Sequence, residues 1–382
     1  MKFNISKNDF SRMLITANRS ILARTNLPIL ANLLISAKSG EVEVLSTNLE
    51  TAVRLSAKSK VEKEGKITIG AKALVEFVSQ LPEGDVSFEL LGEEAVISAD
   101  GYNARFATMN AGEFPAIPKI EKAMDFVVGA SELTEAIGKV AFSAAQDEGR
   151  PILTGVLCEV NKNKLTMVAT DGYRLSFFEN KISKGEKVPN LKIVIPAKAL
   201  MDFGKIIGDI LAIEGAKIPE VKVEIADTLN QLCFKIGNIE FTSRLIEGEF
   251  PNWQKTIPTT FSTVAKINKE EFMKLVKIAS IFAREAGNIV RLKLEENAKK
   301  PIISVFANAS QLGSGNARME IEMQGKGGEI AFNFRYLLEV LSLMEDEEVN
   351  FEMIESLNPG RLRGQDDKDS FFHIVMPVRL QG

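Results

Sequence analysis

The chain has 382 residues, which is longer than one ordinary hydrophobic core supports, so its length predicts about two to four domains. It is 45% hydrophobic and 26% charged, and it has no unbroken apolar run of the roughly 18 residues that a membrane span needs. The net charge of -4 disfavours a protein that grips nucleic acid by charge alone. The N-terminus MKFNISKNDF lacks the apolar stretch of a signal peptide, so we expect a cytoplasmic protein with no membrane contact.

The first third of the chain contains two strand-to-helix patterns. Residues 3–14 (FNISKNDFSRML) predict a strand, a polar cap and an amphipathic helix. Residues 66–81 (KITIGAKALVEFVSQL) predict a β-branched strand that leads into a second helix. This part closes with GEFPAIP at residues 112–118, which predicts a proline-marked loop.

The same order of patterns occurs twice more along the chain. Residues 126–138 (FVVGASELTEAIG) and 192–207 (KIVIPAKALMDFGKII) repeat both strand-to-helix segments, and GEFPNWQKTIP at 248–258 repeats the closing loop. Residues 264–275 (VAKINKEEFMKL) and 329–344 (EIAFNFRYLLEVLSLM) repeat the two segments again. Short alternating runs such as EVEVLST and KLTMVAT predict strands between them.

Two positions recur in all three repeats. A large apolar residue lies on the core face of the first helix, which Ser or Asn opens, at spacings of 123 and 139 residues: Phe10, Leu133 and Phe272. A cation lies at the start of the second helix, at spacings of 126 and 137 residues: Lys72, Lys198 and Arg335. We therefore predict an α+β fold of three similar sheet-dominated domains with two helices each, at residues 1–122, 123–260 and 261–382.

The motifs of common catalytic sites are absent. The chain has no phosphate-cradling glycine loop, no HExxH, no paired cysteines and no GxSxG. Cys158 and Cys233 lie in alternating apolar runs and are expected as small buried hydrophobic residues. His373, the single histidine, is expected on a strand surface. We expect a binding protein with no catalytic residue, metal or cofactor.

The repeated cations suggest what is bound. Cations at one position of three repeats, on a chain that is acidic overall, indicate contact with a polyanion. The alternative is that helix starts commonly carry exposed lysine. A cation near a helix N-terminus is unfavourable to the helix dipole, which favours a functional role.

Seven stretches carry a resemblance to a known family. They are MKF from Met1, LPILANLL from Leu27, GRPILTGVL from Gly149, ATDGYRLS from Ala169, GEFPNWQKTIP from Gly248, FNFRYLLEVL from Phe332 and VMPVRL from Val375. In this order they resemble the bacterial DNA polymerase III beta subunit, the beta sliding clamp, over essentially the whole chain. The resemblance implies the DNA clamp fold and a head-to-tail homodimer that closes into a ring. It also implies a processivity factor that encircles double-stranded DNA through weak contacts.

The resemblance implies contacts with DNA and with a second copy. Arg24 and Lys72 match the family's DNA contacts, and the repeat adds Lys198. Asp147 stands where the family often has a glutamine, and Pro151–Ile152 stand where it often has an aromatic pair.

At the dimer junction, the resemblance places an edge strand of the first domain against a helix of the third. The implied interface residues are Arg105 and Phe106 on the strand and Ile281 and Phe282 on the helix.

The resemblance also implies a groove for short peptide motifs of the replicative DNA polymerase, the clamp loader and repair proteins. By motif, the groove comprises Leu153, Thr170, Gly172, Tyr173, Arg174, Leu175, Pro251, Lys255, Thr256, Asn333, Tyr336, Leu357, Pro359, Met376, Pro377, Val378 and Arg379. Tyr173 stands where the family often has histidine, and Lys255 where arginine occurs. Apolar walls with a few polar groups suit a peptide site.

Two alternatives remain open from the residues alone. One is an enzyme made by triplication, whose active site uses unmarked carboxylates such as Asp171. The other is a scaffold that binds peptides and never encircles DNA. The segments ATDGYRL and VMPVRL are equally compatible with a purely structural turn and terminal strand.

Overall fold

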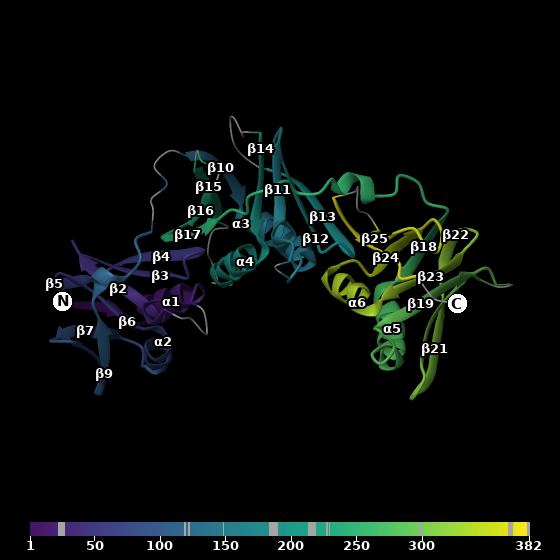
Figure 1. Ribbon diagram of the computed structural model, residues 1–382. Helices are drawn as coiled ribbons and strands as arrows, with labels where there is room; N and C mark the ends of the chain where they lie inside the picture. The colour runs from purple at the N-terminus through teal and green to yellow at the C-terminus, as the bar shows by residue number, and fades with distance from the viewer. Residues whose placement is uncertain are drawn as a thin grey trace. The chain divides into compact units, whose positions relative to one another are not determined.

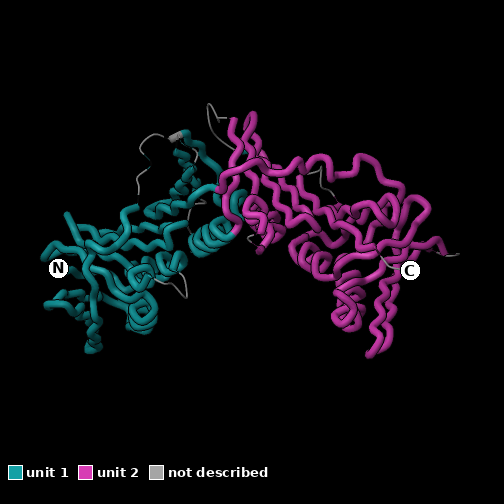
Figure 2. Tube along the Cα trace, viewed as in Figure 1, with its two compact units in different colours: residues 1–134, 182–189, 198–245 teal, residues 135–181, 190–197, 246–382 magenta. Residues whose placement is uncertain are grey.

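The computed structural model describes residues 1–21, 27–117, 120, 123–147, 149–182, 190–212, 219–226, 228, 230–297, 300–365 and 370–379. The chain divides into two compact units, coloured separately in Figure 2. Unit 1 comprises residues 1–134, 182–189 and 198–245, and unit 2 comprises residues 135–181, 190–197 and 246–382. The division therefore passes through the middle repeat.

Each repeat contributes two α-helices within the described part of the chain, as predicted (Figure 1). The first helices are α1 (Lys7–Asn18), α3 (Ala130–Val140) and α5 (Lys269–Ala283). The second helices are α2 (Ala71–Gln80), α4 (Ala197–Leu211) and α6 (Phe334–Leu343). The rest of the secondary structure in the described residues is mostly antiparallel sheet, so the α+β class is confirmed.

Unit 1 is built on one sheet of thirteen strands among its described residues. In order across the sheet they are β10 (Ala123–Gly129), β15 (Glu220–Ala226), β16 (Gln231–Ile236), β17 (Ile239–Arg244), β4 (Thr51–Lys58), β3 (Glu41–Thr47), β2 (Asn32–Lys38), β6 (Gly65–Gly70), β9 (Tyr102–Met109), β8 (Glu94–Ala99), β7 (Asp85–Leu91), β1 (Lys2–Ser6) and β5 (Lys60–Lys63).

Unit 2 holds a nine-stranded and a four-stranded sheet within its described ranges. The larger runs β14 (Leu191–Pro196), β11 (Gly155–Asn161), β12 (Lys164–Thr170), β13 (Arg174–Lys181), β26 (Phe371–Val375), β25 (Gly360–Gly364), β24 (Glu348–Met353), β18 (Thr263–Asn268) and β22 (Glu322–Gly325). The smaller runs β21 (Gly313–Glu320), β20 (Ile302–Ala309), β19 (Ile289–Glu295) and β23 (Gly328–Asn333).

Neighbouring repeats share sheets at two places. In unit 1, β4 of the first repeat pairs antiparallel with β17 of the second, and we call this pairing the first junction. In unit 2, β13 of the second repeat pairs antiparallel with β26 of the third, and we call this the second junction. Each half of the middle repeat is thus bonded to a different neighbour, which is why the chain separates into two units rather than three.

The repeated apolar positions lie in the core. Phe10 and Phe272 are fully buried and Leu133 is 4% exposed, so the predicted core faces of α1, α3 and α5 are confirmed. Ser6 caps α1 and Asn268 caps α5, each by accepting a backbone N–H hydrogen bond. In the second repeat the prediction that Ser opens the helix was wrong, because α3 begins at Ala130 and Ser131 lies inside its first turn.

Two expectations about single residues have different outcomes. Cys158 and Cys233 are free and buried, as predicted, and burial raises the pKa of the Cys158 thiol to about 12. The expectation of a surface histidine was wrong, because His373 lies on β26 with none of its surface exposed. The alternation of residue types along one strand does not reveal whether other parts of the chain cover both of its faces.

No helix within the described ranges is both long and apolar enough to span a membrane.

Candidate functional site

The loop between β12 and β13 is shaped by its own side chains. Asp171 Oδ1 accepts hydrogen bonds from the backbone N–H groups of Tyr173 (2.8 Å) and Arg174 (3.0 Å). The Thr170 hydroxyl donates to the Arg174 carbonyl at 2.5 Å. Gly172 has φ +92°, a left-handed conformation that glycine adopts without strain. The loop holds Tyr173 with 61% of its surface exposed.

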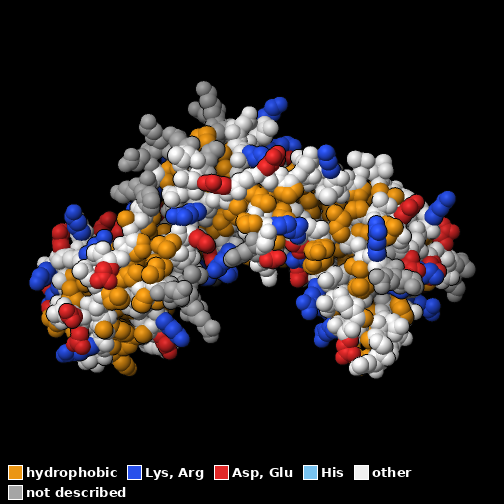
Figure 3. Space-filling model, viewed as in Figure 1, with side chains coloured by type: hydrophobic (Ala, Val, Ile, Leu, Met, Phe, Trp, Pro, Cys, Tyr) orange, Lys and Arg blue, Asp and Glu red, His pale blue; other side chains and the backbone are white. Residues whose placement is uncertain are grey.

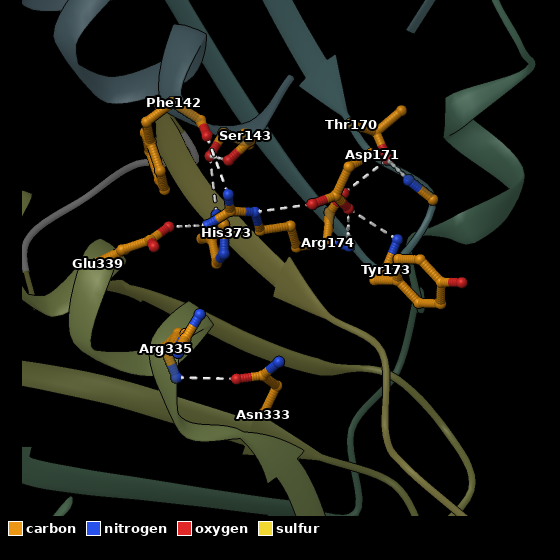
Figure 4. Close-up of polar contacts among 12 residues, drawn as sticks. Phe142, Ser143, Thr170, Asp171, Tyr173, Arg174, Asn333, Arg335, Glu339 and His373 are labelled. Carbon is orange, nitrogen blue, oxygen red and sulfur yellow. Dashed lines mark hydrogen bonds and ion pairs between the residues drawn. The ribbon is translucent and has the colours of Figure 1, made fainter. Parts of the chain in front are cut away.

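Arg174 is the hub of the polar contacts drawn in Figure 4. Its Nε donates to Asp171 Oδ2 at 3.1 Å, one terminal nitrogen donates to the Phe142 carbonyl at 3.0 Å, and the other pairs with the Glu339 carboxylate. The guanidinium also lies over the Tyr336 ring, 4.6 Å from its centre. Because Arg174 is only 7% exposed, it joins β13 to α6 inside the wall of the site.

The segment that follows β26, residues 376–379, contacts both the loop before β13 and β23. The Met376 N–H donates to the Tyr173 carbonyl at 2.8 Å, and the Val378 N–H donates to the Ala331 carbonyl on β23 at 2.8 Å. Residues 376–378 are partly exposed and Arg379 is exposed. The segment is therefore fixed by its backbone between the loop before β13 and the strand before α6, with its side chains available.

An aromatic cluster lies beneath the loop that contains Pro251 and Lys255. Trp253 lies with its ring 5.4 Å from that of Phe177, which stacks on Phe372 at 4.6 Å. Phe177 and Phe372 form one buried core with Leu157, Val168, Leu175, Val194, Phe250 and Ile374, and the partly buried Trp253 packs against it. It fixes the 3₁₀ turn Trp253–Thr256, on which Lys255 is exposed.

All seventeen residues predicted for the groove belong to unit 2. Those that are buried are Leu153, Arg174 and Leu175. Those that are partly exposed are Thr170, Thr256, Asn333, Tyr336, Pro359, Met376, Pro377 and Val378. Those that are exposed are Gly172, Tyr173, Pro251, Lys255, Leu357 and Arg379. Asn333 also caps α6 by accepting the Arg335 N–H at 3.0 Å (Figure 4).

Sequence reasoning missed several residues that hold the site together. Glu339 lies in FNFRYLLEVL but was given no role, and Phe142 lies in none of the matching stretches. Asp171 was given a role only as a carboxylate of an alternative active site. The guanidinium of Arg150 donates to the Asp171 carbonyl at 2.9 Å. The Asp-Gly turn in ATDGYRL was the one signal that pointed to the role of Asp171.

A buried polar chain lies close to Arg174. The hydroxyls of Ser143 and Ser176 are 2.7 Å apart, and the Ser176 hydroxyl is 2.7 Å from His373 Nδ1. Burial, with a further contribution from Arg174, lowers the pKa of His373 to about 3, so this histidine is neutral at physiological pH. Burial also raises the pKa of Tyr336, with the charge of Asp171 as the next contribution.

Of the cations considered for contact with DNA, the structure describes those at the three repeated positions. Arg24 lies outside the described residues. Lys72, Lys198 and Arg335 are exposed at the second positions of α2, α4 and α6, and none forms an ion pair with a described residue. On the face shown in Figure 3, basic and acidic side chains are interspersed and form no continuous basic surface.

The candidate interface residues lie beside unpaired strand edges. Residues 102–107 of β9, which carry Arg105 and Phe106, pair with β8 alone among the described strands. On α5, Ile281 is 56% exposed. The Phe282 ring lies against β21, where a Cβ on Gly315 would come within 2.4 Å of it. The strand β21 is itself an edge of the four-stranded sheet in the described part of unit 2.

Comparison with known proteins gives one consistent result along the chain. Family models of the DNA polymerase III beta subunit match in order: the N-terminal domain at residues 1–118, the central domain at 128–252 and the C-terminal domain at 254–379. The chain is 28% identical to a beta sliding clamp of Synechococcus elongatus over 384 residues, covering 100% of both chains. It is 27% identical to that of Chlamydia muridarum, covering 100% of this chain and 99% of the relative. The crystal structure of the Thermotoga maritima DNA polymerase III beta subunit matches with a TM-score of 0.91 at 26% identity, covering 100% of both chains.

Proposed function

The chain belongs to the DNA polymerase III beta subunit family, and from this membership we propose that it works as a ring around duplex DNA that tethers a polymerase. The observation that carries the proposal is the match of three successive domain models, in order, along one chain. The protein is a sliding clamp, like its full-length relatives. It acts by binding, without catalysing a reaction.

The ring is proposed to form from two copies in head-to-tail contact. Among the described strands, residues 102–107 of β9 in unit 1 and β21 in unit 2 each have a partner on one side only. They support this arrangement because such a backbone edge offers N–H and C=O groups to a partner. Arg105 and Phe106 would meet Ile281 and Phe282 of the second copy. Such a contact joins different surfaces of the two copies, and two of them close a ring.

The contact with DNA is proposed to be weak. Arg24, Lys72 and Lys198 are the candidate cations, on a chain whose net charge is -4. A protein that neutralises many phosphates must break charge-assisted contacts at each step along DNA. A few cations around a wide, hydrated hole attract the duplex and still permit sliding, because the closed ring prevents sideways escape.

The groove of unit 2 is proposed to bind short peptide motifs of the replicative polymerase, the clamp loader and repair proteins. The exposed Tyr173, the fixed backbone of residues 376–378 and the apolar cluster under Trp253 support this role. Apolar side chains of a peptide would supply affinity there, and exposed Lys255 and Arg379 would orient it. We retain boundaries at 1–122, 123–260 and 261–382 as the proposed domains.

Loading onto circular DNA tests the function directly. The purified protein is expected to elute as a dimer and to remain on nicked circular DNA after treatment with a clamp loader and ATP. It is expected to leave when the circle is cut, because only topology holds it. Retention on the cut DNA, or a monomer at micromolar concentration, would contradict the proposal.

A further inference from the structure

The two sheet junctions share one backbone frame. In the first junction, Asn48 Oδ1 accepts hydrogen bonds from the N–H groups of Glu50 (2.9 Å) and Thr51 (2.7 Å), as Asp171 does in the second. The partner segment is also hydrogen-bonded to this loop in the same way in both junctions. The Arg244 N–H donates to the Glu50 carbonyl at 2.9 Å, as the Met376 N–H donates to the loop before β13. The two junctions therefore differ in their side chains and in the segments that cover them.

In the second junction, one face is filled by large apolar side chains. Leu175 faces Ile374 across the pairing, and Phe177 faces Phe372. The two phenylalanine rings stack at 4.6 Å, and Trp253 packs on Phe177 from the covering loop. This loop thus seals the pairing of β13 with β26 on that face.

On the opposite face of the second junction, the pairing is held by buried polar contacts. Ser176 lies opposite His373 and is hydrogen-bonded to it, and Arg174 joins β13 to α6. The second junction is therefore closed on both faces.

At the equivalent positions of the first junction the side chains are small or charged. Ala52 faces Thr242, and Arg54 faces Glu240. One terminal nitrogen of Arg54 lies 3.6 Å from Glu240 and its Nε lies 3.6 Å from Glu43, distances too long for hydrogen bonds. The Arg54 side chain is 26% exposed and its Nε is buried without a hydrogen-bond partner.

The charges continue across the neighbouring strands. Glu240 also faces Lys235 at 3.6 Å, Lys235 pairs with Glu224 at 2.8 Å, and Glu224 pairs with Lys222 at 3.0 Å. Together with Glu43 and Arg54 these residues form an ionic ladder that crosses the first junction. Partly exposed ion pairs of this kind are screened by salt, whereas stacked aromatic rings are not.

A cavity of about 260 Å³ lies beside the ladder. Its walls include Ala52, Arg54 and Thr242, whose counterparts in the second junction are Leu175, Phe177 and Ile374. The apolar side chains of Leu45, Ile117 and Ile120 also line it. On the side of the cavity that Arg54, Glu224, Lys235 and Glu240 line, water fits better than an apolar group. The first junction is sealed by apolar side chains on its opposite face, where Val53 and Phe241 are fully buried.

We infer that the first junction is a salt-responsive joint, which opens more readily than the second and opens further as ionic strength rises. The joint is sealed by apolar packing on one face, while an ionic ladder and a hydrated cavity occupy the other. This property belongs to the isolated chain and does not depend on DNA encirclement. If the protein works as proposed, such a joint lets the pairing of β4 with β17 in each protomer deform when the ring opens, while the proposed groove at the second junction keeps its geometry.

Hydrogen exchange of the whole protein, read by mass spectrometry, tests the inference. Peptides covering β4 and β17 are compared with peptides covering β13 and β26 in about 0.05 M and about 0.5 M NaCl, which changes the screening length severalfold. Exchange at β4 and β17 is expected to rise about fivefold with salt, and that at β13 and β26 to change less than about twofold. An equal response at both junctions, or none at the first, would overturn the inference.

Variants assign the response to the ladder. Arg54→Phe combined with Glu240→Phe copies the second junction's aromatic pair and is expected to remove the salt response. The matched control is Lys300→Gln combined with Glu320→Gln, an exposed pair 3.6 Å apart that is remote from the ladder in sequence, and it is expected to keep the response.

A single substitution covers the case in which the double variant does not fold. Glu240→Gln removes the carboxylate that faces both Arg54 and Lys235. It is expected to give, at low salt, the exchange that the parent protein shows at high salt. An unchanged salt response in Glu240→Gln would also refute the joint.

Discussion

The guanidinium carbon of Arg174 lies 4.6 Å from the centre of the Tyr336 ring, although 162 residues separate the two along the chain. The same guanidinium is bonded to Asp171, Glu339 and a backbone carbonyl. An arginine matched on every side in this way positions its neighbours and has little capacity left for a ligand. Arg174 therefore positions residues of the proposed groove, and its charge is neutralised within the protein.

Arg174→Lys is expected to lower the free energy of unfolding by about 2 kcal/mol. Lysine keeps the charge but loses the planar fork that reaches three partners and the stacking on Tyr336. Urea unfolding measures the change, and Arg12→Lys, at an exposed ion pair on α1, is the matched control. Equal stability of the two variants would show that the Arg174 network contributes nothing to folding.

Met376→Ala is expected to weaken binding of a polymerase-derived peptide about tenfold or more, because a large apolar contact in the proposed groove is lost. Fluorescence anisotropy with a labelled peptide measures the affinity. Met201→Ala on α4 is the control, since Met201 is 40% exposed and lies in unit 1. Unchanged affinity of Met376→Ala would remove this residue from the groove.

His373 is expected to make stability depend on pH below neutrality. Its pKa in the folded protein is lowered to about 3, whereas an unfolded histidine titrates near pH ~6.5. Between these values the unfolded chain binds a proton that the folded chain does not, so the free energy of unfolding falls as pH falls. The loss from this residue is about 1.4 kcal/mol per pH unit, and it is absent above pH ~6.5.

Urea unfolding at several pH values between about 7 and about 5 measures this slope. His373→Gln removes the single histidine of the chain, so the difference between parent and variant isolates its proton. Parallel pH profiles of the two proteins would mean that His373 is exposed to solvent in the folded state.

Ile281→Asp is expected to convert the proposed dimer to a monomer, because a carboxylate would lose its hydration in a contact formed largely by Phe106, Ile281 and Phe282. Size-exclusion chromatography with light scattering measures the mass. Ile15→Asp on α1 is the control, since Ile15 is 41% exposed and belongs to neither candidate interface segment. A dimer that persists in Ile281→Asp would place the contact elsewhere.

Local patterns were sufficient to predict the repeat. Phe10, Leu133 and Phe272 lie on core faces because helical periodicity alone determines which side of an amphipathic helix is apolar. Lys72, Lys198 and Arg335 lie at helix starts because the strand-to-helix transition is encoded within a few residues. The motif order was also sufficient to indicate the family.

Contacts between distant segments were decided only by the tertiary structure. The burial of His373 depends on the side chains that pack over β26, and the role of Arg174 depends on Glu339, to which the sequence pattern assigned no role. The contrast between the two junctions likewise appears only when β4 is paired with β17 and β13 with β26. Sequence periodicity specifies which way a side chain faces along its own element, whereas the partner across the sheet depends on which strands pair, and pairing is a property of the whole chain.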